Sequence, residues 1–207
     1  MKSVKTLALG LFTILFLSFS YSSIEVYASD LQEGSSSQEV KGLQQTLQKL
    51  GYFHANPTGY YGSITEQAVS QFQRDFNVPS TGYTGPLTRN RLEQVKMMAH
   101  VVHGEARGES FKGQVGVAAV ILNRINSSDF PNSTYNVIFQ RNAFTAINDG
   151  QYWLTPNTSA YLAVKDAYLG WDPTGGATYY YNPAGVTDEW IFTRDVITQI
   201  GKHHFAR

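Results

Sequence analysis

The stretch VVHGEARGES, residues 101–110, places a carboxylate where a helix normally buries apolar side chains. Met98, Val102 and Glu105 fall at i, i+4 and i+7, so they share one face of a helix that we expect from Val95 to Ala106. A carboxyl group held against apolar groups resists ionisation, and its pKa rises. Such a group can act as a general acid near neutral pH, which makes Glu105 a candidate catalytic residue.

Two glycines flank this carboxylate, Gly104 on one side and Gly108 on the other. Glycine costs a helix about 1 kcal/mol relative to alanine. Their presence therefore predicts a close approach to the backbone, with room for a ligand. The pattern alone is equally consistent with a structural role, in which Gly108 ends the helix and Glu105 pairs with Arg107 or His103.

Three downstream stretches have the composition of cleft walls, and a further helix over Gln114–Asn123 separates them from Glu105. They are NAFTAINDGQYW (142–153), GWDPTGGATYYYNP (170–183) and IGKHHFAR (200–207). The second combines a glycine turn with three tyrosines, which predicts a short strand. On that strand Tyr179 and Tyr181 share one face and Tyr180 occupies the other.

The N-terminus has the pattern of a secretory signal over residues 1–28. Two lysines precede an apolar run from Leu7 to Phe19, and Val26-Tyr27-Ala28 offers small residues for cleavage. The run is short for a membrane span, so we expect a secreted protein without a stable membrane span once the signal is removed. A retained single-span anchor is the alternative.

The amino-acid composition excludes some classes of ligand and partner. The chain of 207 residues contains no cysteine, which excludes disulfides and thiolate metal sites. Without residues 1–28 it carries 14 basic and 15 acidic side chains, so no strong field favours nucleic acid. The 13 tyrosines, 12 phenylalanines and 3 tryptophans are suited to packing against sugar rings, although most rings are expected in the core.

The first half of the chain predicts a small helical module. We interpret residues 29–37 as a flexible leader because they are polar and rich in glycine and serine. Ser36 with Glu39, and Ser63 with Glu66, form capping-box patterns that open two helices.

A short internal repeat completes this module. TGYYGSIT (58–65) and TGYTGPLT (81–88) agree at five positions, and each is a glycine-rich turn that leads into a helix. With LQQTLQKLGYF and TGYYGSITEQAVSQFQRDFNV, these segments resemble the peptidoglycan-binding type 1 module, a three-helix fold, which we place at residues 38–93. Thr58 and Thr81 stand where that family usually has aspartate, and a threonine hydroxyl accepts backbone hydrogen bonds more weakly.

The boundary near residue 94 lacks the features of a mobile linker. Leu92, Val95 and Met98 continue the apolar spacing across it, and no run of proline, glycine or polar residues intervenes. We therefore expect the module and the rest of the chain, residues 94–207, to pack against each other.

The second part resembles the catalytic domain of the SleB-type spore cortex-lytic enzymes, a cell wall hydrolase family. The resemblance is carried by HGEARGE, GQVGVAAVILNRI, AFTAINDGQ, GWDPTGGATYYYNP and IGKHHFAR. It implies a mostly α (α+β) fold related to lysozymes and lytic transglycosylases, with the family's catalytic glutamate at Glu105. The residues expected to line the sugar groove are Phe144, Thr145, Tyr179, Tyr180 and Asn182.

The mechanism depends on whether a second carboxylate takes part. Glycoside hydrolases normally use two, and Asp149 and Asp172 are candidates for the second. Neither shows the placement of Glu105 on an apolar stripe. A lytic transglycosylase needs one carboxylate, acting first as acid and then as base, and yields 1,6-anhydro ends after N-acetylmuramic acid. We expect this reaction on peptidoglycan glycan strands, without cofactor or metal.

Three alternatives remain open at this point. The first is a hydrolytic muramidase that cleaves the same bond with water. The second is a non-catalytic wall-binding protein in which Glu105 is structural. The third is a zinc amidase, although the five histidines form no HExxH helix and His203-His204 diverge on a strand. The expected location is the cell wall, or the spore cortex and the exterior of the inner spore membrane, and the sequence leaves open whether an accessory protein takes part.

Overall fold

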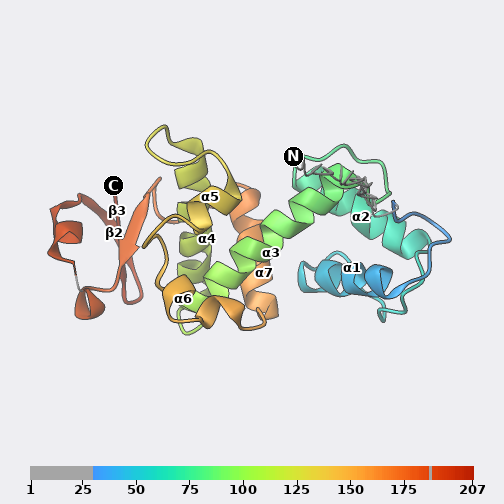
Figure 1. The fold of residues 1–207 in the computed structure, drawn as a ribbon, viewed down its shortest axis with the longest axis horizontal. Coiled ribbons are helices and arrows are strands. Elements are labelled where there is room, and N and C mark those ends of the chain that lie inside the picture. Colours follow the sequence, from blue (N-terminus) through green and yellow to red (C-terminus); the bar gives the residue numbers. More distant parts are fainter. Residues whose placement is uncertain (1–29, 187) are drawn as a thin grey trace, which may run out of the picture.

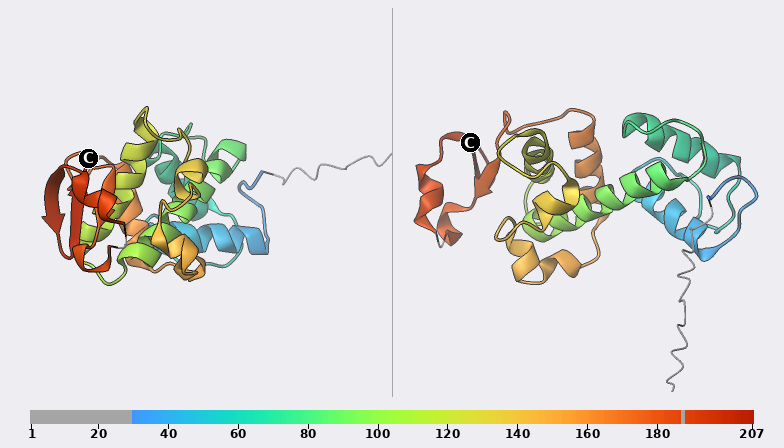
Figure 2. Two further views of the ribbon diagram at one scale, coloured as in Figure 1. Left: turned by 60° about the vertical axis from the view of Figure 1, so that its left-hand side comes forward. Right: turned by 45° about the horizontal axis from the view of Figure 1, so that its top comes forward.

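The computed structural model describes residues 30–186 and 188–207. The signal predicted for residues 1–28 lies outside this range. Seven helices and a small sheet form an elongated molecule in which one long helix, α3 (Pro86–Ala106), runs from an N-terminal module into a larger C-terminal domain (Figure 1). The turned views show the same arrangement, with the sheet and the N-terminal module at opposite ends (Figure 2). The mostly helical fold expected from the sequence is confirmed.

The N-terminal module consists of α1 (Gln38–Lys49), α2 (Ser63–Asp75) and the first turns of α3. The two predicted helix starts are each displaced by one residue. Ser37, not Ser36, caps α1 and accepts a hydrogen bond from the backbone N–H of Val40 at 3.2 Å. Ser63 is the first residue of α2, and Gly62 precedes it without a side-chain cap.

Two buried glutamines connect the repeated turns to the helices that precede them. The Gln44 amide accepts from the N–H of Gly59 at 2.9 Å and donates to the carbonyl of Tyr60 at 2.8 Å and to the hydroxyl of Thr65 at 2.9 Å. The internal repeat predicted from the sequence is thus a structural one.

Gln73 makes the matching three bonds in the second turn. It accepts from the N–H of Gly82 at 2.9 Å and donates to the carbonyl of Tyr83 and the hydroxyl of Thr88, both at 2.8 Å. In the first turn Thr58 also accepts from the N–H of Tyr60 at 3.2 Å, as expected of a threonine in place of aspartate.

The described part of the segment predicted as a leader, residues 30–37, pairs with both repeated turns and buries Leu31, while most of its other side chains are exposed. Leu31 is 5% exposed and forms an isolated β-bridge with Thr84, while Ser36 bridges Tyr60. A buried leucine together with backbone pairing to both repeated turns offsets the polar, glycine-rich composition on which the prediction rested.

The C-terminal domain contains four further helices around the second half of α3. They are α4 (Phe111–Asn126), α5 (Thr134–Ile138), α6 (Thr145–Asn148) and α7 (Thr158–Tyr168), joined by the 3₁₀ turns η1 (Gln151–Trp153), η2 (Pro183–Gly185) and η3 (Glu189–Thr193). Helices α3, α4 and α7 pack against one another and form the core of the domain. The predicted helix at Gln114–Asn123 lies within α4.

A three-stranded antiparallel sheet covers one side of α4 and ends the chain. Its strands are β1 (Tyr179–Tyr181), β2 (Val196–Ile200) and β3 (His203–Ala206), in the order β1-β3-β2. Phe205 of β3 packs against Gly116 of α4, where a Cβ atom would lie only 2.8 Å from the ring. A glycine at that position of α4 therefore lets the sheet approach the helix closely.

The module and the domain contact each other directly, as the sequence predicted. Lys49 Nζ donates to the carbonyl of Pro156 at 3.1 Å. Lys165 Nζ donates to the carbonyl of Leu50 at 3.2 Å and lies 4.2 Å from the ring centroid of Tyr52. Because α3 is also continuous through residue 94, the two parts share one rigid support.

Candidate active site

Glu105 lies in the last turn of α3, half-buried, in phase with Met98 and Val102, which are both fully buried. Its Oε1 accepts a hydrogen bond from the backbone N–H of Ala146, the second residue of α6, at 2.6 Å. The alternative pairing with Arg107 is not formed, because that guanidinium donates to carbonyls at the end of α3. The carboxylate is thus directed toward the 142–153 segment.

The glycine before Glu105 makes room for the protein itself. A Cβ atom at Gly104 would lie 2.5 Å from the Cβ of Ala146, so only glycine lets α6 come this close to α3. Nothing lies within 4 Å of the corresponding position at Gly108. The expectation that both glycines make room for a ligand is therefore wrong at Gly104, where α6 occupies the space.

Tyr180 provides a second hydrogen bond to the carboxylate. Its hydroxyl donates to Glu105, and burial together with the nearby carboxylate raises the pKa of Tyr180 well above its usual value. The phenol therefore stays protonated and remains a donor at any working pH. The ring of Tyr180 lies between those of Phe144 and His203, with centroid distances of 6.4 Å and 5.3 Å.

The environment raises the pKa of Glu105 above its usual value of 4.5. Burial is the largest cause, and the negative charge of Asp149 acts in the same direction. The hydrogen bonds from Ala146, Tyr180 and the backbone of Thr145 oppose this rise. Burial thus favours the protonated form of the carboxyl group, and the hydrogen bonds favour the ionised form. A group that acts first as an acid and then as a base needs access to both forms.

Arg124 is a residue of the site that the sequence analysis missed. It is 6% exposed, its Nε donates to the carbonyl of Thr178 at 2.7 Å, and its Nη1 donates to that of Ala143 at 3.4 Å. It thereby joins the segment before β1 to the segment before α6, which supply the two partners of Glu105. Burial lowers the pKa of Arg124, and the negative charge of Glu105 opposes that shift.

A signal for Arg124 was present in the sequence. The residue lies at i+7 from Val117 and i+4 from Val120, both fully buried, on the apolar face of α4. A charged residue on a buried face indicates a buried partner or a functional role. Three rings surround its guanidinium at 5.0–5.8 Å; they belong to Phe130, Phe144 and Tyr179.

The residues predicted to line the sugar groove occupy different environments. Thr145 is exposed beside Glu105, and Tyr179 and Asn182 are half-buried. Phe144 is only 2% exposed, and its ring packs against Arg124 and Tyr180. The ring therefore belongs to the core and does not line the groove, where it was expected.

The predicted alternation along β1 is present. Tyr180 faces Phe205 and the core, at a centroid distance of 6.0 Å. Tyr179 contacts Trp190 of η3 at 5.5 Å, and Tyr181 contacts Phe192, also of η3, at 5.5 Å. Trp190 is 49% exposed, so it adds an aromatic surface beside Tyr179 that sequence analysis had not assigned to the site.

The two candidates for a second carboxylate differ. Asp172 accepts four hydrogen bonds, from the N–H groups of Thr174 and Gly176, the hydroxyl of Thr174 and the amide of Asn123. It holds the turn before β1, which satisfies its oxygens structurally. Asp149 is exposed, and Gln151 donates to it from both its backbone and its side chain.

The histidines form no metal centre in the described part of the chain. No group of three or more histidine, cysteine, aspartate or glutamate side chains there is arranged to hold a metal ion. His203 and His204 face opposite sides of β3, against Tyr180 and Tyr181 respectively, as expected for neighbours on a strand.

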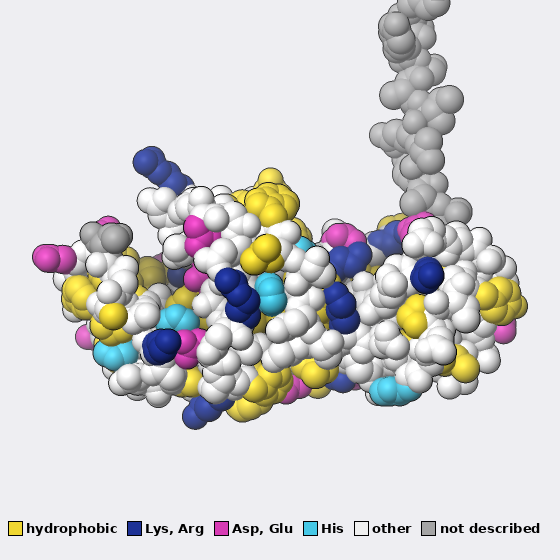
Figure 3. All heavy atoms as spheres, turned by 90° about the horizontal axis from the view of Figure 1, so that it is seen from below, with side chains coloured by type: hydrophobic (Ala, Val, Ile, Leu, Met, Phe, Trp, Pro, Cys, Tyr) yellow, Lys and Arg dark blue, Asp and Glu magenta, His cyan; other side chains and the backbone are white. Residues whose placement is uncertain are grey.

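A concave region lies in the N-terminal module between α1 and α3, and it does not include Glu105. Among the described residues, Glu105 is the half-buried carboxylate that accepts from both a backbone N–H and a phenol, which makes it the candidate reacting group. Seen from below, Lys, Arg, Asp and Glu side chains are interspersed over the molecule, with no large patch of either charge on that face (Figure 3). Within residues 30–186 and 188–207, no helix has the length and apolar character needed to span a bilayer.

Fold and site together define a class. A half-buried glutamate at the end of a helix, facing an aromatic strand in a mostly helical domain, has the environment of a general acid, and a three-helix module is attached to this domain. Family models support both parts: Cell Wall Hydrolase matches residues 108–206, and the peptidoglycan binding domain matches residues 36–92. The chain belongs to the family of spore cortex-lytic enzymes, because one of these enzymes is 36% identical to it with 94% of this chain aligned.

Individual relatives support this membership. A spore cortex-lytic enzyme of Bacillus cereus is 36% identical, with 94% of this chain and 93% of that protein aligned. A Bacillus subtilis spore cortex-lytic enzyme is 54% identical over 54% of this chain and 37% of that protein.

A solved structure resembles the C-terminal domain. The catalytic domain of the germination-specific lytic transglycosylase SleB from Bacillus anthracis is 57% identical, with a TM-score of 0.53, covering 55% of this chain and 93% of that one. Glu105 lies just before the residues that the Cell Wall Hydrolase model matches, so its role rests on the geometry described above.

Proposed function

We propose that this enzyme is a lytic transglycosylase that cleaves peptidoglycan glycan strands after N-acetylmuramic acid, with Glu105 as the catalytic residue. Protonated Glu105 donates its proton to the bridging oxygen, and the bond between C1 and that oxygen breaks. The resulting carboxylate removes the proton from the C6 hydroxyl of the same sugar. The C6 oxygen then bonds to C1, which closes a 1,6-anhydro ring and returns Glu105 to its protonated form.

The observation that supports this cycle best is the environment of a single carboxyl group. Burial favours the protonated form that the first step needs. The N–H of Ala146 and the hydroxyl of Tyr180 stabilise the carboxylate that forms after proton transfer. Arg124 is bonded to the segments just before β1 and α6, which carry these two donors. The carboxylate form of Glu105 is therefore stabilised without rearrangement of the site.

We further propose that the sugar groove runs over the exposed residues around Glu105. Thr145 on α6 and Asn182 after β1 offer hydroxyl and amide groups, and the rings of Tyr179 and Trp190 offer apolar faces. Tyr180 acts from beneath the groove by positioning Glu105. Residues 94–207 form the catalytic domain in this scheme, and residues 38–93 form the wall-binding module.

The relatives named above are spore cortex-lytic, and one is described as germination-specific. We therefore propose that the substrate is cortex or cell wall peptidoglycan, and that residues 1–28 direct secretion to it.

Hydrolysis of the same bond is the second candidate, and one observation favours it. The exposed carboxylate of Asp149 is close enough for its charge to raise the pKa of Glu105, and a base near the acid could activate water. Asp172 is a poorer second group because its oxygens already accept four hydrogen bonds.

Product analysis distinguishes the two reactions. Purified cortex and vegetative sacculi are digested side by side, and the glycan products are analysed by mass. We expect anhydro ends from the parent, which lack one water relative to reducing ends. Reducing ends alone would contradict the transglycosylase.

Two variants complete this experiment. Glu105→Gln should remain folded and lose activity by about 10²–10⁴-fold, the usual contribution of a general acid and base. Asp149→Asn should keep most of the parent activity. A large loss in Asp149→Asn, together with reducing ends, would establish the hydrolytic alternative.

A further inference from the structure

A groove separates α1 from α3 in the N-terminal module, with a volume of about 550 Å³. Each helix lines it with residues at i, i+3, i+4 and i+7, so one face of each helix points toward the other. These residues are Glu39, Gly42, Leu43 and Thr46 on α1, and Arg89, Leu92, Glu93 and Lys96 on α3. Leu31 and Thr84, which form the β-bridge of the packed leader, complete the lining.

Gly42 in the middle of α1 has no structural explanation within the module. Glycine is among the poorest helix formers, yet nothing lies within 4 Å of where its Cβ atom would be. Unlike Gly104, it makes room for no other part of the described chain. The missing side chain leaves that side of the groove open, and the carbonyl of Gly42 is already bonded by the hydroxyl of Thr46 at 3.0 Å.

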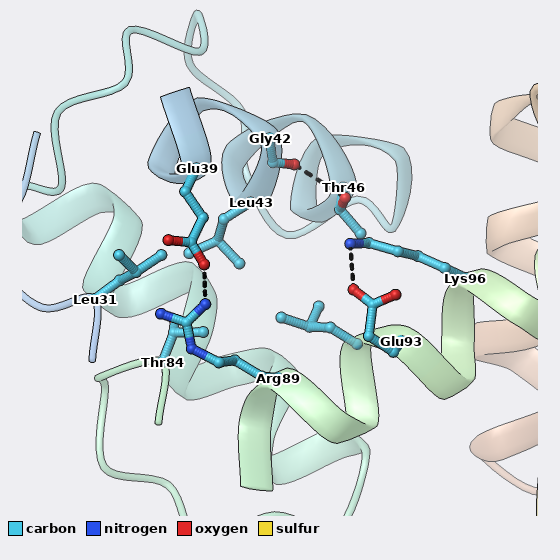
Figure 4. Close-up of a pocket in the computed structure, with 10 residues that line it drawn as sticks. Leu31, Glu39, Gly42, Leu43, Thr46, Thr84, Arg89, Glu93 and Lys96 are labelled. Carbon is cyan, nitrogen blue, oxygen red and sulfur yellow. Dashed lines mark hydrogen bonds and ion pairs between the residues drawn. The ribbon is translucent and has the colours of Figure 1, made fainter. Parts of the chain in front are cut away.

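Charges of both signs lie at the two ends of the groove, as the close-up shows (Figure 4). Glu39 pairs with Arg89 at one end. Glu93 pairs with Lys96 at 2.7 Å at the other, near Thr46. Leucine side chains provide apolar surface between these pairs, with Leu43 and Leu92 both nearly buried.

We propose that this groove binds the peptide arm of peptidoglycan, while the glycan strand is bound at the catalytic domain. This inference rests on the proposed function in taking peptidoglycan as the substrate. No aromatic ring lines the groove, so it lacks the flat apolar surface on which sugars pack. A short peptide with carboxylates, an ammonium group and methyl side chains matches the two ion pairs, the leucines and the gap at Gly42.

The continuous helix gives this site a fixed relation to the reacting carboxylate. Leu92 in the groove and Glu105 lie on the same helix, α3, and at 1.5 Å per residue they are separated by about 20 Å along its axis. A peptide held in the groove would therefore position its own glycan strand at a set distance from Glu105. The hydrogen bonds of Lys49 and Lys165 also join the module that carries the groove to the domain that carries Glu105.

The test uses the full chain carrying Glu105→Gln, so that binding is measured without cleavage. The free stem tetrapeptide of peptidoglycan, and separately peptide-free glycan oligomers, are titrated while backbone amide resonances are followed by NMR. We expect the tetrapeptide to shift resonances of Gly42, Leu43, Leu92 and Lys96. The peptide-free glycan should instead shift resonances around Thr145 and Tyr179.

Two matched variants show whether the groove itself is the site. Gly42→Leu should stay folded, since leucine favours helix and finds space there, and should weaken tetrapeptide binding by about tenfold or more. Gln71→Leu adds the same side chain to an exposed position of α2 and should leave binding unchanged. A thermal melt of each variant confirms folding.

The outcomes separate this inference from the proposed function. Tetrapeptide shifts confined to the groove and lost in Gly42→Leu would support it. Groove shifts with the peptide-free glycan, no shifts with the tetrapeptide, or equal binding by both variants would overturn it. None of these results bears on whether the parent enzyme forms anhydro ends.

Discussion

The two halves of the molecule bury polar side chains in different ways. In the N-terminal module Gln44 and Gln73 are neutral, and each is bonded on both its amide oxygen and its amide nitrogen by one repeated turn. In the catalytic domain Glu105 and Arg124 are ionisable. Burial raises the pKa of Glu105 and lowers that of Arg124, so in both cases it favours the neutral form. Tyr180 lies between them and remains a donor.

This difference separates polar groups that build a fold from polar groups that carry out chemistry. A neutral amide with all its partners supplied locally is satisfied and stays in one state. In a buried carboxyl with two donors, burial favours the protonated form and the donors favour the ionised form, so the group can give and take a proton. Burying the ionised form costs stability. The comparison can be tested from both sides.

The largest expected effect on stability comes from the buried glutamines. Gln73→Leu keeps the approximate size of the side chain but leaves the N–H of Gly82 and the carbonyl of Tyr83 without their partner. We expect the free energy of unfolding to fall by about 2–4 kcal/mol, the cost of several unsatisfied buried polar groups. Urea unfolding measures it.

The exposed Gln71→Leu is the control and should change this free energy by less than about 0.5 kcal/mol. Gln44→Leu should resemble Gln73→Leu, because its three bonds are equivalent. Losses similar to that of Gln71→Leu would mean that the buried amides do not support the turns.

The next effect concerns catalysis and is tested by a pair of glycines. Gly104→Ala brings a methyl group against Ala146 and must displace α6, which carries the N–H bonded to Glu105. A displacement of about 1 Å can reduce the rate about 100-fold. Glu105 itself is unchanged in this variant, so lost activity on sacculi would report its positioning.

Gly108→Ala is the matched control, since nothing lies within 4 Å of the added methyl group and the activity should be retained. Equal activity of the two alanine variants would show that the approach of α6 to α3 is not needed for the reaction.

The smallest effect is a gain in stability on removing the catalytic carboxyl group. The pKa of Glu105 is raised in the folded protein, so its full contribution is present below the pKa of the unfolded state and is lost as the pH rises through the folded pKa. Glutamine does not ionise, so the variant does not lose stability as the pH rises. Glu105→Gln should therefore be more stable than the parent by about 0.5–2 kcal/mol at neutral pH, and the difference should shrink in acid.

Thermal unfolding of both proteins across this pH range provides the measurement. A difference that stays constant, or that grows as the pH falls, would contradict a raised pKa at Glu105.

Much of the fold and part of the site could be predicted from the sequence. The phase of Met98, Val102 and Glu105 placed the carboxyl on the buried face of its helix, and the structure confirms that face. The repeated turns and the packing of the two parts were also predicted correctly. The packed leader was missed, because the burial of Leu31 depends on Thr84, far along the chain.

The sequence by itself determined which helix face carries the carboxylate, which turns repeat, and which residues can donate or accept. These properties depend on spacings of a few residues, and a helix or a turn fixes them locally. Only the tertiary structure decided that Ala146 and Tyr180 are the partners of Glu105, that Phe144 is core, and that Gly104 makes room for protein. Such contacts join residues far apart in sequence, and they form only when α3, α6 and β1 pack together around Arg124.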